Sequence, residues 1–162
     1  MSNISAKMVK ELRDRTGAGM MECKKALTNS LGDMEKAVEE MRKAGQAKAD
    51  KKSSRIAAEG VITLSISENK KIANIIEINC ETDFVAKDEN FLKFVEKISE
   101  ISLTNFSGSI EDFLNSHHPS GKTIEEVRLE LVSKVGENVK IRRIQAIESK
   151  NSFIGHYMHG TK

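Results

Sequence analysis

The chain has 162 residues, of which 38% are hydrophobic, 31% charged and only 4% aromatic, so a folded core must be largely aliphatic. Residues 1–55 carry 13 Lys and Arg against 8 Asp and Glu, a net charge of +5, and the remainder carries 13 against 16, a net charge of −3. Lys is interleaved with Glu along the predicted helices, which favours solvated helix faces over a dedicated nucleic-acid or membrane surface. No signal peptide and no apolar run of membrane-spanning length is visible, and we expect a soluble cytoplasmic protein.

The first 45 residues predict three short helices in a small bundle, near the lower size limit for independent folding. Ser5 and Asp33 are suited to cap the first and third helices, and Gly45 to end the third. Met20 and Met21 are consecutive, so we expect one to pack inward and the other to touch a partner. The expected inward faces consist of Val9, Leu12, Met20, Cys23, Leu27, Leu31, Met34, Ala37, Val38 and Met41.

Residues 46–55 are rich in Lys and Ala, lack an apolar stripe and predict a linker helix. No aromatic side chain is interleaved with its basic residues for base stacking, so the evidence for RNA binding is weak. The basic side chains that form the best nucleic-acid candidate in the chain are Lys48, Lys51, Lys52 and Arg55.

From Gly60 the apolar period changes to two, which predicts a β-hairpin with one buried face. Its strands cover residues 60–67 and 72–80, joined by a turn at residues 68–71. An amphipathic helix follows and ends near Ser102. The apolar stripe of that helix consists of Phe91, Phe94, Val95, Ile98 and Ile101.

The connection between this hairpin and helix, residues 80–88, places a carboxylate and a phenyl ring side by side at Asp83 and Phe84. Phe84 lies seven residues before Phe91, so it could extend the apolar stripe of the helix into the core. Two charged residues interrupt that stripe, however, and Thr82 followed by Asp83 is typical of a helix cap or turn. The pattern alone leaves core packing and an exposed wedge offered to a partner as equal alternatives.

The region after this helix predicts a loop over residues 107–121, interrupted by a short turn at residues 110–114. Thr123 and Glu126 then form a capping box, and Gly136 stops the helix that it opens. The expected inward face of that helix consists of Ile124, Val127, Leu131 and Val135.

Two further strands are predicted, over residues 139–148 and 153–159. In the first, a bulge at Arg142 and Arg143 would bring all the apolar side chains to one face. These side chains are Val139, Ile141, Ile144 and Ala146. No later segment can pair with the second strand, so we expect either an unordered tail from about Ser149 or a homodimer formed through this C-terminal edge.

The sequence offers little support for an enzyme. Cys23 and Cys80 lack a metal-binding spacing and fall on apolar faces, and the adjacent His117 and His118 cannot easily share one ion. The Gly-rich segment at residues 17–19 lies between helices rather than after a strand, and no Ser or Cys nucleophile has a credible base. We therefore expect no bound metal, no cofactor and no catalytic residue.

Several motifs resemble bacterial elongation factor Ts, and the similarity extends over nearly the whole chain. The opening matches at MVKELR (residues 8–13), RTGAGMM (15–21) and CKKAL (23–27). The core signature matches at AAEGV (57–61) and NCETDFVA (79–86), and shorter matches are GEN (136–138), RR (142–143) and YMHG (157–160). The two long motifs are highly specific, because a chance match of that length is implausible.

The resemblance implies an α+β fold in four parts. They are a three-helix, ubiquitin-associated-like bundle at residues 1–45, a linker helix at 46–55, a core subdomain at 56–148 that packs a small antiparallel sheet with helices, and the start of a second subdomain at 149–162. Most members of the family continue into that second subdomain. We expect this chain to be a truncated form or an unusually short member.

The resemblance also implies a guanine-nucleotide exchange factor that binds elongation factor Tu with GDP, displaces its Mg²⁺ and promotes GDP release so that GTP can bind. The residues that would dislodge the Mg²⁺ are Thr82, Asp83, Phe84 and Val85. Further partner contacts would be Leu12, Met20, Met21, Val135, Gly136, Asn138 and His159. The alternatives are a protein-binding module resting on residues 1–45 alone and an RNA-binding module using residues 48–55, both without exchange activity.

Overall fold

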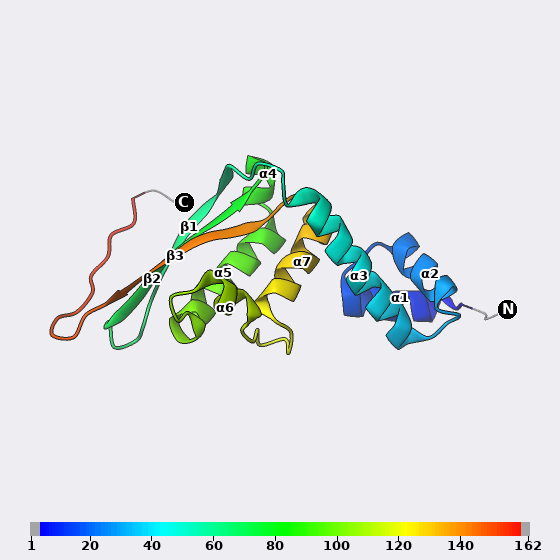
Figure 1. The fold of residues 1–162 in the computed structure, drawn as a ribbon, viewed down its shortest axis with the longest axis horizontal. Helices are drawn as coiled ribbons and strands as arrows, with labels where there is room; N and C mark the ends of the chain where they lie inside the picture. The colour runs from blue at the N-terminus through cyan, green and yellow to red at the C-terminus, as the bar shows by residue number, and fades with distance from the viewer. Residues whose placement is uncertain (1–3, 160–162) are drawn as a thin grey trace.

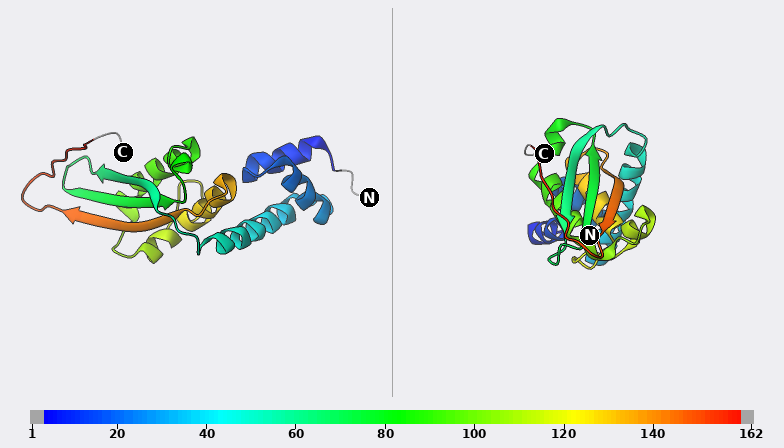
Figure 2. Two further views of the ribbon diagram at one scale, coloured as in Figure 1. Left: turned by 90° about the horizontal axis from the view of Figure 1, so that it is seen from above. Right: turned by 90° about the vertical axis from the view of Figure 1, so that its left-hand side faces the viewer.

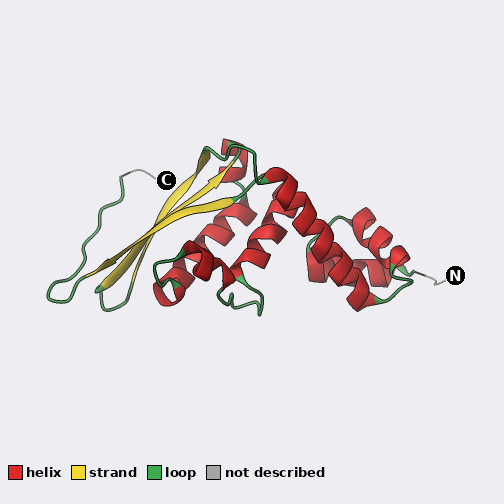
Figure 3. Ribbon diagram, viewed as in Figure 1, coloured by secondary structure: helices red, strands yellow, loops and turns green. Residues whose placement is uncertain are grey.

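A computed structural model describes residues 4–159 and places helices at one end and a β-sheet at the other, with a layer of helices between them (Figures 1 and 3). The described residues form seven helices and three strands, which confirms the expected α+β class. The helices are α1 Ala6–Thr16, α2 Met20–Asn29, α3 Met34–Lys52, α4 Asp83–Ala86, α5 Glu89–Asn105, α6 Ile110–Asn115 and α7 Ile124–Val135. The strands are β1 Glu59–Ile66, β2 Ile72–Cys80 and β3 Lys140–Glu148.

The predicted three-helix bundle is formed by α1, α2 and the first half of α3. Ser5 and Asp33 cap their helices as expected, each accepting a hydrogen bond from a backbone N–H three residues later. Two predicted inward residues are wrong: Met20 is 43% exposed, and Leu31 is 78% exposed because it lies in the turn after α2 with a positive φ of 53°. The buried bundle core consists of Val9, Leu12, Cys23, Ala26, Leu27 and Ala37.

Helix α3 does not end at Gly45, as its sequence predicted, but continues to Lys52 and takes in most of the expected linker. A Cβ atom at Gly45 would lie 3.3 Å from the Ser133 hydroxyl of α7, so the absence of a side chain suits a close crossing of the two helices. One turn later, Ala49 is buried in the second hydrophobic core. The cost of a glycine inside a helix is offset here by tertiary packing.

The three strands form an antiparallel sheet in the order β1-β2-β3. The register shifts where Glu77 opposes Arg143 and Ile78 opposes Ile141, so Arg142 is the extra residue and the predicted bulge is confirmed. Of the four side chains expected on the buried face, Ala146 is exposed although its partner Asn74 on β2 is buried, because α5 packs over β1 and β2 rather than over the edge strand β3.

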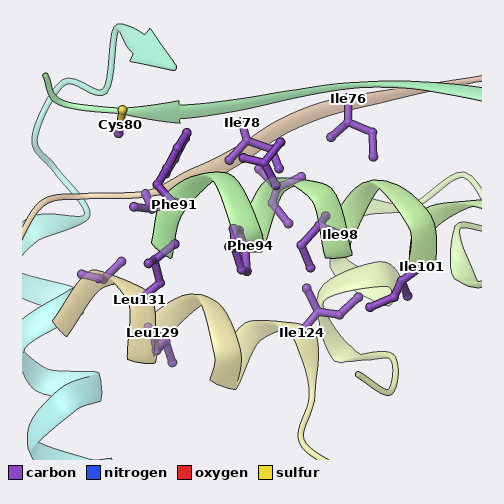
Figure 4. Close-up of a cluster of buried hydrophobic side chains, with 14 of the residues drawn as sticks. Ile76, Ile78, Cys80, Phe91, Phe94, Ile98, Ile101, Ile124, Leu129 and Leu131 are labelled. Carbon is purple, nitrogen blue, oxygen red and sulfur yellow. The ribbon is translucent and has the colours of Figure 1, made fainter. Parts of the chain in front are cut away.

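Helix α5 packs directly on β1 and β2, and α7 packs against α5 on the same side of the sheet (Figure 2). The predicted stripe of α5 is buried throughout and packs between β2 and α7 (Figure 4). The capping box of α7 is also confirmed, with Thr123 and Glu126 bonding each other's backbone N–H groups. The buried face of α7 differs from the prediction, because α7 packs against α3 as well as α5: Leu129 and Val132 are buried, whereas Val127 and Val135 are only partly so.

The predicted strand at residues 153–159 is wrong, since residues 149–159 follow an irregular path back along β1 (Figure 1). Backbone bonds tie this segment to the hairpin turn, from Ser149 N–H to Lys71 O and from Ile154 N–H to Lys70 O, both 2.8 Å. The Lys71 ammonium lies 4.5 Å from the centre of the Phe153 ring. These contacts attach the segment to a turn, so it adds no strand to the sheet. Gly160 of the YMHG motif lies outside the described residues.

Candidate functional site

The connection between β2 and α5 forms the one-turn helix α4, whose most exposed apolar side chain is that of Phe84. Thr82 caps this turn, with its hydroxyl accepting a 3.4 Å hydrogen bond from Val85 N–H. Ala86 is buried and Val85 packs against the core, so both anchor the turn from below. Phe84 is 82% exposed, whereas Phe91 is fully buried. Of the two interpretations that the pattern left open, core packing is therefore excluded in this structure.

The turn that precedes β3 holds the start of α4 from outside its own segment. One carboxylate oxygen of Glu137 accepts hydrogen bonds from Glu81 N–H at 3.1 Å and Thr82 N–H at 3.0 Å. Its other oxygen accepts a bond from the Thr82 hydroxyl at 2.6 Å. Hydrogen bonds to a charged acceptor are stronger than neutral ones, so this carboxylate fixes the backbone where β2 ends.

The turn before β3 also donates hydrogen bonds to the segment that follows β2 and to the end of α3. The Glu81 carboxylate accepts a 2.6 Å hydrogen bond from Asn138 N–H and lies 3.6 Å from the Arg55 guanidinium. Asn138 is 5% exposed, and its amide donates to the carbonyl of Arg55 at 3.0 Å. The Lys52 ammonium donates to the Gly136 carbonyl at 2.7 Å. These bonds join the end of α3, the turn at residues 136–138 and the start of α4 in one network.

Burial and a neighbouring carboxylate disfavour the thiolate form of Cys80. Burial, followed by the negative charge of Glu137, raises the pKa of Cys80 to about 11, so the thiol stays protonated at neutral pH.

Two carboxylates at the starts of α4 and α5 are hydrogen-bonded. The Asp83 carboxylate accepts a 2.7 Å hydrogen bond from the exposed Lys87 ammonium. On the next helix, bonds from the Asn90 side chain and from the backbone N–H groups of Asn90 and Phe91 lower the pKa of Asp88. Asp88 is therefore an ionised cap that fixes α5 behind α4.

The structure separates the predicted partner contacts of the bundle into surface and core. Met21 is 75% exposed and Met20 43%, so both lie at the surface and the expectation that one packs inward is wrong. Both methionines lie at the start of α2, where the N–H of Cys23 donates to the carbonyl of Gly19 and no side chain caps the helix. Leu12 is fully buried in the bundle core, so in this structure it supports the surface and cannot contact a partner directly.

The remaining predicted contacts divide in a similar way. Val135 and Gly136 end α7 beside the network at α4, and Gly136 is exposed in the left-handed conformation at φ 80°. Asn138 is a buried support. His159 lies apart on the irregular C-terminal segment, where its ring accepts or donates a 3.2 Å hydrogen bond with the Tyr157 hydroxyl.

Sequence reasoning missed Glu81 and Glu137 as members of the site. Each follows the end of a regular element, and neither has a periodic neighbour that would identify its role. The only signal available was that both stand inside matched motifs, NCETDFVA and GEN. Their pairing joins positions more than 50 residues apart, which only the fold can bring together.

A second feature, away from α4, is a cleft of about 570 Å³ between the bundle and α7. Its lining mixes basic and acidic side chains, including Arg15, Arg42, Glu126 and Glu130, so charge does not select a ligand. Among residues 4–159 no group of three His, Cys, Asp or Glu side chains could hold a metal ion. Within that same part of the chain, the helices are all too short or too polar to cross a membrane.

Comparison with known proteins identifies the family. Residues 81–162 match the family model described as Elongation factor TS. The chain is 53% identical over 162 residues to Elongation factor Ts of Legionella pneumophila (strain Lens), and 53% identical over 162 residues to that of Francisella tularensis subsp. novicida (strain U112). It is 51% identical over 160 residues to that of Methylococcus capsulatus.

These alignments cover 99–100% of this chain but only 55% of each relative, so the chain spans about half the length of the proteins it matches. The family match includes both the α4 turn and the turn at residues 136–138 that holds it. On the strength of that match and of the identity along its whole length, the chain belongs to the elongation factor Ts family.

Proposed function

We propose that this chain carries the part of a guanine-nucleotide exchange factor that binds elongation factor Tu in its GDP form, displaces Mg²⁺ and promotes GDP release. The observation that carries the proposal is Phe84, a phenyl ring 82% exposed on a short turn that hydrogen bonds fix in place. A large exposed apolar side chain on an ordered connection is suited to enter a pocket on another protein.

The wedge segment, defined as residues 82–85, would act on the nucleotide site of the partner. Mg²⁺ bridges the nucleotide phosphates to a GTPase, and its loss removes the largest positive charge at that site. Burying the Phe84 ring in an apolar pocket would contribute about 1.5–3 kcal/mol, which can hold the partner's elements apart. By linkage, the coupling is reciprocal. If the exchange factor lowers the affinity of the partner for nucleotide by some ratio, bound nucleotide lowers the affinity of the partner for the exchange factor by the same ratio.

The exposed Met20 and Met21 would dock the bundle on the partner, because Met adapts its shape to a neighbouring surface. Val135 and Gly136 would extend the contact beside the wedge segment. In this proposal the chain has no catalytic chemistry of its own and acts in the cytoplasm, where translation takes place. Its organisation would be a bundle at residues 1–45, a core at 56–148 and the start of a second subdomain at 149–162, with the second half of α3 joining the first two.

A homodimer through the C-terminal segment remains part of the proposal. Phe153 and Tyr157 are 74% and 83% exposed there, so they offer apolar surface to a second copy. Sedimentation over a range of protein concentrations tests it, and a monomer at every concentration would contradict it.

RNA binding by residues 48–55 is less well supported. The Lys48 ammonium pairs with Glu22, Lys52 donates to the Gly136 carbonyl, and Arg55 lies 3.6 Å from Glu81. Three of the four basic groups are thus engaged within the chain. An RNA-binding surface would instead show affinity that falls steeply as salt is raised.

The test is the rate at which labelled GDP leaves purified elongation factor Tu in the presence of the chain. We expect the wild-type chain to accelerate release and Phe84→Ala to lower that acceleration about tenfold or more, because the pocket contact is lost. Ile147→Ala is the control, since this side chain is also exposed but lies at the end of β3 far from α4. A folded Phe84→Ala variant as active as wild type would overturn the proposal.

A further inference from the structure

We infer that Glu137 is a positioning residue that sets the direction of the Phe84 wedge, acting through Thr82. The inference rests on the proposed function of residues 82–85. It goes beyond that function, since it gives a role in nucleotide exchange to a side chain that the partner need not touch. Three of the bonds already described carry it: those from Glu81 N–H, Thr82 N–H and the Thr82 hydroxyl to one carboxylate.

The Thr82 hydroxyl joins Glu137 to the helix turn. A hydroxyl has one hydrogen to donate, and the 2.6 Å bond to Glu137 takes it. A lone pair is then left to accept the bond from Val85 N–H that caps α4. Glu137 therefore fixes the rotation of the very group that starts the turn carrying Phe84.

The turn cannot set its own direction. Helix α4 has four residues, and a helix this short does not hold its shape without outside contacts. Val85 and Ala86 anchor its lower side by packing, which leaves the first residues, Glu81 and Thr82, to be held by other contacts. The carboxylate bonds at the first residues of the turn supply the missing restraint.

Glu137 is itself held on both sides. Gly136 before it takes a left-handed conformation that ends α7, and its carbonyl accepts the Lys52 bond. Asn138 after it is buried and donates its N–H to Glu81. Through these bonds, the position of Glu137, and with it that of Phe84, depends on α3 and α7. These two helices also connect to the bundle.

The first experiment compares Glu137→Ala, Glu137→Gln and Glu148→Ala in the full chain, with GDP release from elongation factor Tu as the readout. We expect Glu137→Ala to lower the release rate at saturating factor about tenfold, the effect of losing charge-assisted hydrogen bonds. Glu137→Gln should recover most of the rate, because its amide oxygen can accept both backbone N–H groups while the Thr82 hydroxyl turns to accept from the amide nitrogen. Glu148→Ala, at the far end of β3, should match wild type.

Amide hydrogen exchange provides a readout besides activity. In Glu137→Ala, the amides of Glu81 and Thr82 should lose protection while those of β2 and α5 keep theirs. Unchanged protection at residues 81–82 would overturn the inference, as would a loss of protection that spreads equally through the sheet, since that would mark Glu137 as a general stabiliser.

A double variant separates this inference from the function on which it rests. If Glu137 acts through the wedge, Glu137→Ala should cost nothing further in a chain that already carries Phe84→Ala. Additive losses would overturn the positioning role and leave the wedge intact. If Phe84→Ala alone has no effect on release, the proposed function fails instead.

Discussion

Two helix starts in this protein present exposed apolar side chains, and the structure builds them in opposite ways. At α4, a Thr cap and a carboxylate from a distant turn fix the backbone under a single phenyl ring. At α2, the cap position is Gly19, with no side-chain hydrogen bond, and the exposed side chains are two flexible methionines. The contacts at α4 fix the position of one apolar side chain, whereas those at α2 leave two flexible side chains able to change their conformation.

The difference suggests a division of labour within one interface. Under the proposed function the Phe84 ring enters a pocket at a nucleotide site and needs a fixed direction, because a small error would place it outside that pocket. A docking surface mainly supplies buried area, and accurate geometry contributes less to it. Helix α3 connects the two sites, with its first half in the bundle and its end bonded to the turn that holds α4.

The largest expected effect tests whether Phe84 is as free of the core as the comparison requires. Phe91→Ala should lower the free energy of unfolding by about 3–5 kcal/mol, because it leaves a cavity in the main core. Phe84→Ala should change it by less than about 0.5 kcal/mol, as for an ordinary surface residue. Chemical denaturation of both variants provides the measurement. A large loss for Phe84→Ala would mean that the ring stabilises the fold.

The next effect concerns the adaptable site. Replacing Met20 and Met21 together by Ala should weaken binding to elongation factor Tu about tenfold, because about 1.5 kcal/mol or more of apolar burial is lost. The GDP release rate at saturating factor should stay unchanged, since the wedge is intact. Met158→Ala is the control, as that side chain is 49% exposed on the C-terminal segment. A variant with normal affinity but a lower saturated rate would reverse the division of labour.

The elements with a regular apolar period could be predicted from the sequence. The stripe of α5, the hairpin and the capping box at Thr123 follow from local pattern, and the bulge at Arg142 followed from a change of parity within one strand. The continuation of α3 through Gly45 could not, because propensity favours a stop there and the close crossing with α7 is a tertiary contact. The C-terminal segment alternates like a strand, yet its backbone bonds go to a turn.

The candidate site also contains residues that the sequence could indicate and residues that only the fold brings together. Residues 82–85 were predicted as site residues from the resemblance, while the sequence pattern alone could not decide whether Phe84 was in the core or at the surface. The role of Leu12 was misjudged, because a motif match does not distinguish a contact from its support. Glu137 was missed because its partners lie more than 50 residues earlier and no periodicity connects them.

The smallest effect concerns an ion pair between α2, which carries the exposed methionines, and α3. The Lys48 ammonium pairs with Glu22 in the first turn of α2, and both side chains are about half exposed, at 50% and 51%. Exposed pairs contribute about 0.2–1 kcal/mol and are weakened by salt, so this one should leave α2 free to adjust. A double-mutant cycle with Lys48→Ala and Glu22→Ala, measured by unfolding at low and high salt, gives the coupling energy. A coupling above about 2 kcal/mol that persists at high salt would show α2 to be held as firmly as α4, and the contrast between the two helix starts would fail.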